Sequence, residues 1–419
     1  MTHVDENFLR MPSHLRLDPA DDGDDVPQKV RLMVKGQGTI GFAIERMAPF
    51  SVSIGAASWG EPAFRWTIGF KGAVLEERVE GEWWALKAEP IARAADPGPA
   101  LDPEPTCPYW FSFDPANRAL IYGKGEMRLG CGLLRYPLSP RPEDAPDPYA
   151  WLAQAECVEV SAPIRGNVNV WRDPVTVEPP MRVIPMDAMT LEKVSCGAVT
   201  VPANLTPTSQ ILYGTIAGRD FVLDEGDFPQ FSTAIRESID SEDGWCRKVL
   251  EAKASEFGSK DENKTYLRIT LGQNQGESPG IPYVMEIWPA GHYSPIHNHG
   301  WADAVIRVLH GRINVSLYPM LSPLHEVPFA KEEFAAGDVT WISPQLNQIH
   351  MLKNEDPAEP CVTIQCYMYA ETNLTHWPYF DYLEKSSVGH FDPNSDADFM
   401  DFKQIMKTEW QARHGKTEG

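Results

Sequence analysis

Short apolar segments, joined by glycine-containing turns, make up much of the first half of the chain. Within them apolar and polar residues alternate and aromatic residues are frequent, as in strands that bury one face. Such strands are predicted at residues 39–44, 50–54, 64–70, 83–87, 109–113 and 119–122. Further strand-like pieces follow at residues 158–160, 168–171 and 210–216. The pattern predicts an antiparallel β-sandwich-like domain, with a barrel as the alternative.

The second half begins with a helical pattern and then changes to strands. Phe231, Ile235 and Ile239 recur at helical spacing, and residues 244–257 repeat the pattern, so two helices are expected. Strands are then predicted at residues 266–271, 283–288, 303–309, 312–318, 338–342, 348–353 and 362–369. A succession of short strands of this kind is typical of a jelly-roll barrel.

Three regions are therefore expected, in a protein that is mainly β. Residues 1–27, with their run of aspartates, are interpreted as a flexible acidic leader. Residues 28–222 form a β-rich N-terminal domain for which the sequence reveals no role. Its aromatic runs at residues 83–84 and 109–113 are interpreted as core. Residues 223–419 form the barrel domain with its short helical lead-in.

The chain is acidic, with a formal net charge of −22 at pH 7. Such a surface repels phosphate backbones and anionic lipid headgroups, so nucleic acid and membranes are not expected as partners. No apolar run approaches the roughly 20 residues that a bilayer span needs. Seven scattered cysteines without a CxxC spacing are typical of reduced thiols. We expect a cytoplasmic protein; the sequence indicates no oligomeric state.

Three histidines in the predicted barrel have the spacing of metal ligands. His297 and His299 are two residues apart on an extended segment, so both side chains project to the same side. Gly291 precedes the pair, Gly311 follows it, and His350 lies in a later strand. These spacings resemble the two motifs of the cupin superfamily. We therefore predict a metal ion on His297, His299 and His350.

A fourth, acidic ligand is not expected. The position that a glutamate occupies in the usual cupin motif is Ala304 here. Asp303 lies one residue earlier, and a one-residue step on a strand reverses the direction of the side chain. Asp303 should therefore point away from the metal, unless an irregular turn brings it back. Three imidazoles suit Fe, Zn, Cu or Ni, so the ligands alone do not identify the metal.

Residues 266–367 resemble the cysteine dioxygenase family of thiol-oxidising enzymes. The sequence Tyr266-Leu-Arg268 is similar to the family's Tyr-x-Arg strand, and the residues that lead to the first two histidines are also similar. His350 matches the third ligand, and Tyr367 matches the family's active-site tyrosine. The N-terminal domain has no counterpart in the compact members of the family.

The resemblance implies a non-haem Fe(II) dioxygenase, an oxidoreductase that uses O2 to convert a small thiol to its sulfinic acid. The implied substrate carries a carboxylate, as cysteine and related mercapto acids do. Arg268, a two-pronged donor, would bind that carboxylate and act in catalysis with Tyr367. Tyr266 and Trp288 would contact the substrate, and Trp288 and Trp301 would form walls of the pocket.

Two residues depart from the family pattern. Gln365 replaces the histidine that supports the tyrosine; it can bind Tyr367 or substrate by hydrogen bonds but carries no charge. Ala304 stands where animal members have a cysteine cross-linked to the tyrosine, so no cross-link can form. Two other hypotheses stay open: a cupin metalloenzyme with a non-thiol substrate, and a non-catalytic metal-binding cupin module.

Overall fold

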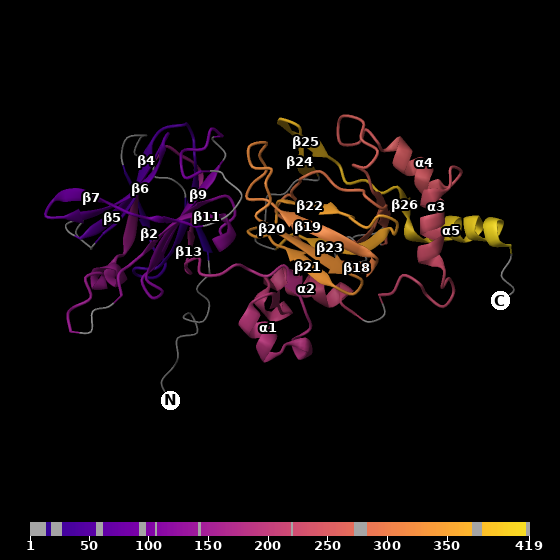
Figure 1. The fold of residues 1–419 in the computed structure, drawn as a ribbon, viewed down its shortest axis with the longest axis horizontal. Coiled ribbons are helices and arrows are strands. Elements are labelled where there is room, and N and C mark those ends of the chain that lie inside the picture. The colour runs from indigo at the N-terminus through magenta and orange to yellow at the C-terminus, as the bar shows by residue number, and fades with distance from the viewer. Residues whose placement is uncertain are drawn as a thin grey trace. The chain divides into compact units, whose positions relative to one another are not determined.

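The computed structural model describes residues 14–17, 27–55, 62–91, 98–104, 107–140, 144–218, 221–271, 283–370 and 379–415 (Figure 1). The chain divides into two compact units, residues 1–178 and 179–419. Antiparallel sheets dominate both units, and the longer helices belong to the second unit. The predicted fold class, mainly β with a sandwich and a barrel that follows a helical lead-in, is confirmed.

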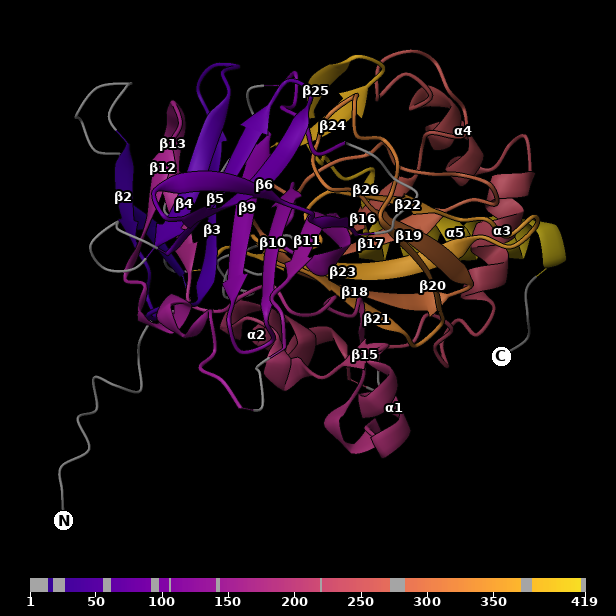
Figure 2. The ribbon, with the colours of Figure 1, turned by 60° about the vertical axis from the view of Figure 1, so that its left-hand side comes forward.

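The first unit consists of two antiparallel sheets. In order, the seven strands of one sheet are β1 (His14–Leu17), β13 (Ile164–Trp171), β3 (Gly38–Ile44), β9 (Pro108–Asp114), β10 (Ala119–Lys124), β11 (Gly132–Pro137) and β8 (Glu89–Pro90). The six of the other are β2 (Gln28–Arg31), β12 (Cys157–Ser161), β4 (Phe50–Gly55), β5 (Ala63–Gly69), β6 (Gly72–Val79) and β7 (Glu82–Leu86). Figure 2 shows β3, β9, β10 and β11 side by side.

Aromatic side chains from both sheets form the core of this sandwich. The rings of Phe42 and Phe50 are 5.6 Å apart, and those of Trp66 and Tyr122 are 5.9 Å apart. The predicted core run at residues 109–113 is buried, whereas Trp84 on β7 is 63% exposed. Strand β1 lies within the expected leader, of which residues 1–13 and 18–26 lie outside the described residues.

The second unit has the two facing sheets of a barrel. In order, the larger sheet has β15 (Val199–Thr200), β14 (Arg182–Val183), β21 (Val339–Ile342), β18 (Asp303–His310), β23 (Cys361–Met368), β17 (Tyr283–Trp288), β16 (Leu267–Thr270) and β26 (Ala397–Asp398). The smaller has β20 (Ala330–Ala335), β19 (Arg312–Leu317) and β22 (His350–Lys353). A hairpin, β24 (Phe380–Glu384) and β25 (Ser387–Phe391), was not predicted. Trp288, Val315 and Leu352 are among the side chains that fill the space between the sheets.

Helices cover the outer face of the larger sheet. They are α2 (Pro207–Ile216), α3 (Phe231–Asp240), α4 (Trp245–Ala252) and α5 (Phe399–His414). The short helix α1 (Leu191–Cys196) has no buried side chain. Helices α3, α4 and α5 bury Phe231, Leu250 and Phe402 against Ile269 and Ile287, and Figure 1 shows α3 beside α5. Within the described residues, no helix is both long enough and apolar enough to cross a membrane. All seven cysteines are free.

Residues 210–216, predicted as a strand, belong to helix α2 instead. Pro207 occupies the first turn of α2, and the Thr206 hydroxyl accepts a hydrogen bond from the Ser209 amide at 3.0 Å. Both features favour a helix start, and they outweigh the apolar residues that favoured a strand. Leu212 and Ile216 then pack against β18 and β23.

The boundary between the two units lies after residue 178. It was expected between residues 222 and 223. Strand β14 pairs with β21, with Arg182 opposite Thr340, and so extends the larger sheet of the second unit. Helix α2 packs on the same sheet. Residues 179–222 therefore belong to the barrel unit because their apolar residues are buried there.

The structure predicts that substituting alanine for the two motif glycines, Gly291 and Gly311, lowers stability by different amounts. Gly311 has φ +70°, and a Cβ there would lie 2.5 Å from the Pro360 carbonyl oxygen; Gly291 has φ +78° and open space around the same position. Gly291→Ala should cost only the left-handed backbone strain, about 1–2 kcal/mol. Gly311→Ala should cost at least about 1 kcal/mol more, because backbone must move. Urea unfolding of both variants tests this; equal midpoints would contradict it.

Candidate metal centre

The alternation of side chains along three adjacent strands selects what faces the barrel interior. On β16, β17 and β23, Ile269, Ile287 and other apolar residues face the helices. The intervening positions on the same strands include Arg268, Glu286 and Gln365, which point the other way and line an internal cavity. Arg268 and Glu286 are register partners on neighbouring strands. The sheet therefore places a polar group inside the barrel without interrupting its apolar outer face.

Backbone hydrogen bonds bring the two histidine motifs together. The His297 amide donates to the His350 carbonyl at 3.0 Å, and the His350 amide donates to the His297 carbonyl at 3.1 Å. Asn354 is fully buried, and its side-chain amide donates to the Trp288 carbonyl at 2.9 Å. The segment that carries His297 and His299 is thus fixed against β22, which begins at His350.

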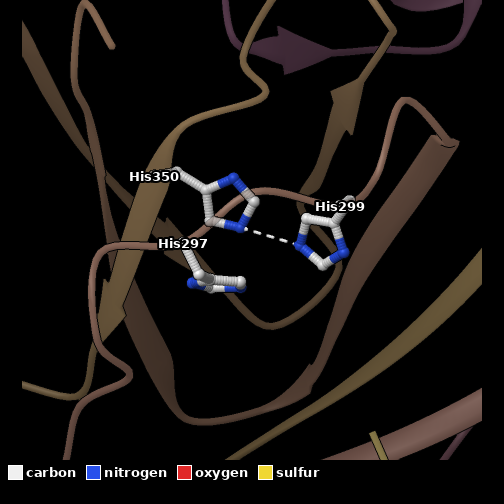
Figure 3. A group of neighbouring side chains, drawn as sticks. All are labelled: His297, His299 and His350. Carbon is white, nitrogen blue, oxygen red and sulfur yellow. Dashed lines mark hydrogen bonds between the residues drawn. The ribbon is translucent and has the colours of Figure 1, made fainter. Parts of the chain in front are cut away.

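The three histidine side chains converge on one point (Figure 3). All three are buried, and their ligand nitrogens lie within 4.8 Å of one another. The Nε2 atoms of His299 and His350 are 3.2 Å apart. Two nitrogen ligands at right angles, each about 2.1 Å from a metal ion, would be about 3.0 Å apart. The spacing therefore suits two ligands of one ion.

The protonation of the rings also suits metal binding. His297 Nδ1 lies 3.0 Å from the Pro295 carbonyl, and His350 Nδ1 lies 3.1 Å from the Asn347 carbonyl. A carbonyl oxygen only accepts, so each Nδ1 carries the proton and each Nε2 keeps a lone pair for a metal. Burial lowers the pKa of His297 to about 4 and that of His350 to about 3, so both rings are neutral at pH 7.

His299 completes the fit to a metal ion. Burial, with His350 and His297 next to it, lowers its pKa well below the usual value. Its Nδ1 is buried without a hydrogen-bond partner among the described residues. The His299 ring is neutral, and its Nε2 points toward the rings of His297 and His350. Among the described residues, His297, His299 and His350 are the one group of three or more such side chains placed to share an ion.

Asp303 does not join this group. It is buried on the side of α2, where its carboxylate accepts hydrogen bonds from Thr206 at 2.5 Å and Ser209 at 2.7 Å. Ala304, one residue on, faces the interior opposite Tyr367 on β23. Trp301, expected in the pocket wall, is 56% exposed and does not line the cavity.

The cavity beside the histidines is small and enclosed. Its volume is about 10 Å³, which is room for roughly one water molecule. The histidines, Arg268, Glu286 and Gln365 form its polar lining, and Tyr266, Trp288, Leu352 and Phe380 form its apolar lining. The Tyr266 and Trp288 rings are stacked, with centroids 4.2 Å apart. A substrate must therefore displace part of this lining to enter.

A chain of hydrogen bonds links the polar lining residues to Tyr367. Arg268 donates to Glu286 Oε1 at 2.5 Å, the Gln365 amide donates to Glu286 Oε2, and the Tyr367 hydroxyl donates to Gln365 Oε1. The Tyr367 ring stacks on His299 with centroids 5.3 Å apart. Burial, and then the charge of Glu286, raises the pKa of Tyr367, so its hydroxyl keeps its proton.

Glu286 was not predicted from the sequence. It is 3% exposed, at the centre of a strand whose neighbours in sequence are Met285 and Ile287. Burial raises the pKa of its carboxyl, and the Arg268 charge opposes this rise. The Arg268 guanidinium at 2.5 Å favours the ionised form of the carboxylate. The signal in the sequence was a single acidic residue within an apolar strand, which requires a buried partner.

No family model matches the chain. The similar solved structures include the cupin domain of an XRE-family transcriptional regulator from Enterobacter cloacae (11% identity, 25% of this chain, 98% of that chain, TM-score 0.21). Another is an uncharacterised protein with a double-stranded β-helix domain from Klebsiella pneumoniae (17% identity, 29% of this chain, 88% of that chain, TM-score 0.22). A third is oxalate oxidase in complex with glycolate (17% identity, 25% of this chain, 51% of that chain, TM-score 0.20). At these TM-scores the barrel assignment rests on strand order and packing, and no activity is inferred from the similarity.

Removal of one histidine ligand should abolish metal binding. His297→Ala should lower the affinity for Fe(II) or Co(II) by more than about 100-fold, since the loss of an outer partner alone costs about 10- to 100-fold. The matched control is His292→Ala, because His292 contacts the Thr265 carbonyl at 2.9 Å and lies outside the metal group. Metal content after anaerobic loading and desalting measures both. Full metal occupancy in His297→Ala would contradict the assignment.

Proposed function

We propose that this chain is a non-haem Fe(II) dioxygenase that oxidises a small thiol to its sulfinic acid. The observation that carries the proposal is a site of three neutral imidazoles, His297, His299 and His350, with no acidic side chain among the described ligands. Neutral ligands leave a divalent ion its full charge, which favours an anionic substrate ligand such as a thiolate. The resemblance of residues 266–367 to thiol dioxygenases supports the same substrate class and the choice of iron.

Bound Fe(II) would supply a redox-active Lewis acid that lowers the pKa of the substrate thiol and lets O2 react with it. In the overall reaction, one thiolate and one O2 give one sulfinate, and both oxygen atoms become bonded to sulfur. Sulfur loses the four electrons that O2 gains, so no other reductant is required. Substrate thiol and O2 are thus the only small-molecule partners that the proposal needs.

The chain's own residues would orient the substrate and keep out water. Trp288 and Phe380 close the cavity with apolar surface, which limits side reactions of activated oxygen. Tyr367 holds its proton on the hydroxyl oxygen, and Gln365 fixes the direction of that hydroxyl. The same two residues would position oxygen atoms as they are added to sulfur.

The proposal predicts oxygen uptake that depends on thiol. Protein purified without air and loaded with Fe(II) should consume O2 when a small thiol is supplied, and mass spectrometry should show a product heavier by two oxygen atoms. The panel should include cysteine, 3-mercaptopropionate, 2-aminoethanethiol and 2-mercaptoethanol. His297→Ala should give no uptake above that of free Fe(II), whereas His292→Ala should keep the activity.

Two results separate this proposal from the other hypotheses. Full iron occupancy with no uptake for any thiol would overturn thiol oxidation and favour a non-thiol substrate. A protein that binds neither iron nor another divalent metal would overturn the metalloenzyme altogether. Tyr367→Phe removes only one hydroxyl and should lower the rate by about 10- to 100-fold while iron stays bound.

A further inference from the structure

Arg268, expected to bind a substrate carboxylate, already has a carboxylate partner inside the protein. Arg268 is 4% exposed and Glu286 is 3% exposed, and their closest atoms are 2.5 Å apart. The second oxygen of Glu286 accepts the Gln365 amide. Each oxygen of this carboxylate therefore already accepts a hydrogen bond, and the guanidinium charge is matched before any substrate arrives.

A second carboxylate in this cavity would meet unfavourable charge. It would stand beside Glu286 in a space of about 10 Å³, where no layer of water can screen the two anions. Two carboxylates that share a buried site repel each other, and one must give up its charge. Arg268 also gives an Nη1 donor to Glu286, so a substrate carboxylate would compete with Glu286 for the guanidinium.

The Nε donor of Arg268 is still available. Its Nε is buried and has no hydrogen-bond partner among the described residues. A single buried N–H is satisfied by a neutral oxygen acceptor, such as an amide carbonyl or a hydroxyl. An ammonium group would place a second cation beside Arg268, whose charge already matches the single charge of Glu286.

We infer that Glu286 takes the place of a substrate carboxylate, so that the site accepts small thiols with an uncharged, oxygen-bearing far end and rejects mercapto acids. This inference rests on the proposed thiol oxidation and replaces its expected carboxylate-bearing substrate. Glu286 acts as a specificity-determining residue through Arg268. The charge balance of the pair, rather than the shape of the cavity, decides between substrates of equal size.

The test compares a neutral thiol with an anionic one. 3-Mercaptopropanamide and 3-mercaptopropionate have nearly the same size and shape. Each is titrated without air into the Co(II)-loaded protein, where a bound thiolate gives a charge-transfer absorption band. The amide should bind at least tenfold more tightly than the acid, and 2-aminoethanethiol should also bind more weakly than the amide. Equal or tighter binding of 3-mercaptopropionate would overturn the inference.

A variant of Glu286 tests whether this residue determines the preference for the amide over the acid. Glu286→Gln keeps the size of the side chain and removes its charge, so Arg268 becomes an unmatched cation. The order should then reverse, with 3-mercaptopropionate bound more tightly than the amide. The matched control is Glu332→Gln on β20, because Glu332 accepts a hydrogen bond from Arg182 at 2.9 Å outside the cavity. Its preference should equal that of the unmodified protein.

The outcomes separate this inference from the function on which it rests. If no thiol changes the Co(II) spectrum, the proposed thiol oxidation fails and the inference fails with it. If thiols bind but the unmodified protein prefers the acid, only the inference fails. A folded, metal-loaded Glu286→Gln protein that still prefers the amide would remove Glu286 as the determinant. Should that variant not fold, the comparison of the two thiols on the unmodified protein still decides.

Discussion

The exchange of two backbone hydrogen bonds between His297 and His350 is the constraint on which the centre depends. It fixes a loop segment that carries two ligands to the strand that carries the third, although the two parts are far apart in the chain. Burial then keeps the three rings neutral, and neutral rings have lone pairs to offer. Without an ion, these buried nitrogens would lack adequate partners, which is unfavourable in a dry core. Backbone pairing and burial together therefore account for a site suited to a metal.

The larger sheet of the barrel separates two tasks by side-chain alternation. Its outer face is apolar and binds the helices, and its inner face carries a buried ion pair and the residues hydrogen-bonded to it. Burying Arg268 and Glu286 is costly, and their mutual contact and the Gln365 amide help to offset that cost. The ion pair that allows these two charges to be buried also makes the site favour ligands without a charge of their own. Stability and selectivity thus depend on one interaction in this site.

Physical features visible in the sequence account for much of the second unit. Alternation predicted strands β16 to β19 and β21 to β23, and helical spacing predicted α3 and α4, because both patterns depend on residues close together in the chain. Helix α2 was missed, since the cap at Thr206 and Pro207 outweighed a pattern that favoured a strand. Helix α5 was missed as well: its Phe402 and Met406 are buried against α3 and β16, partners more than a hundred residues earlier in the chain.

For the candidate site, the sequence by itself determined His297 and His299, because two residues of spacing on an extended segment place two side chains on one side. His350 followed from the spacing of the second motif. The sequence also determined that Asp303 points away, because a one-residue step on a strand reverses direction. Only the tertiary structure decided the partner of Arg268. That partner is Glu286, which lies 18 positions later and becomes its neighbour only when β16 pairs with β17. A buried charge always needs a partner, but the register of strands chooses which residue it is.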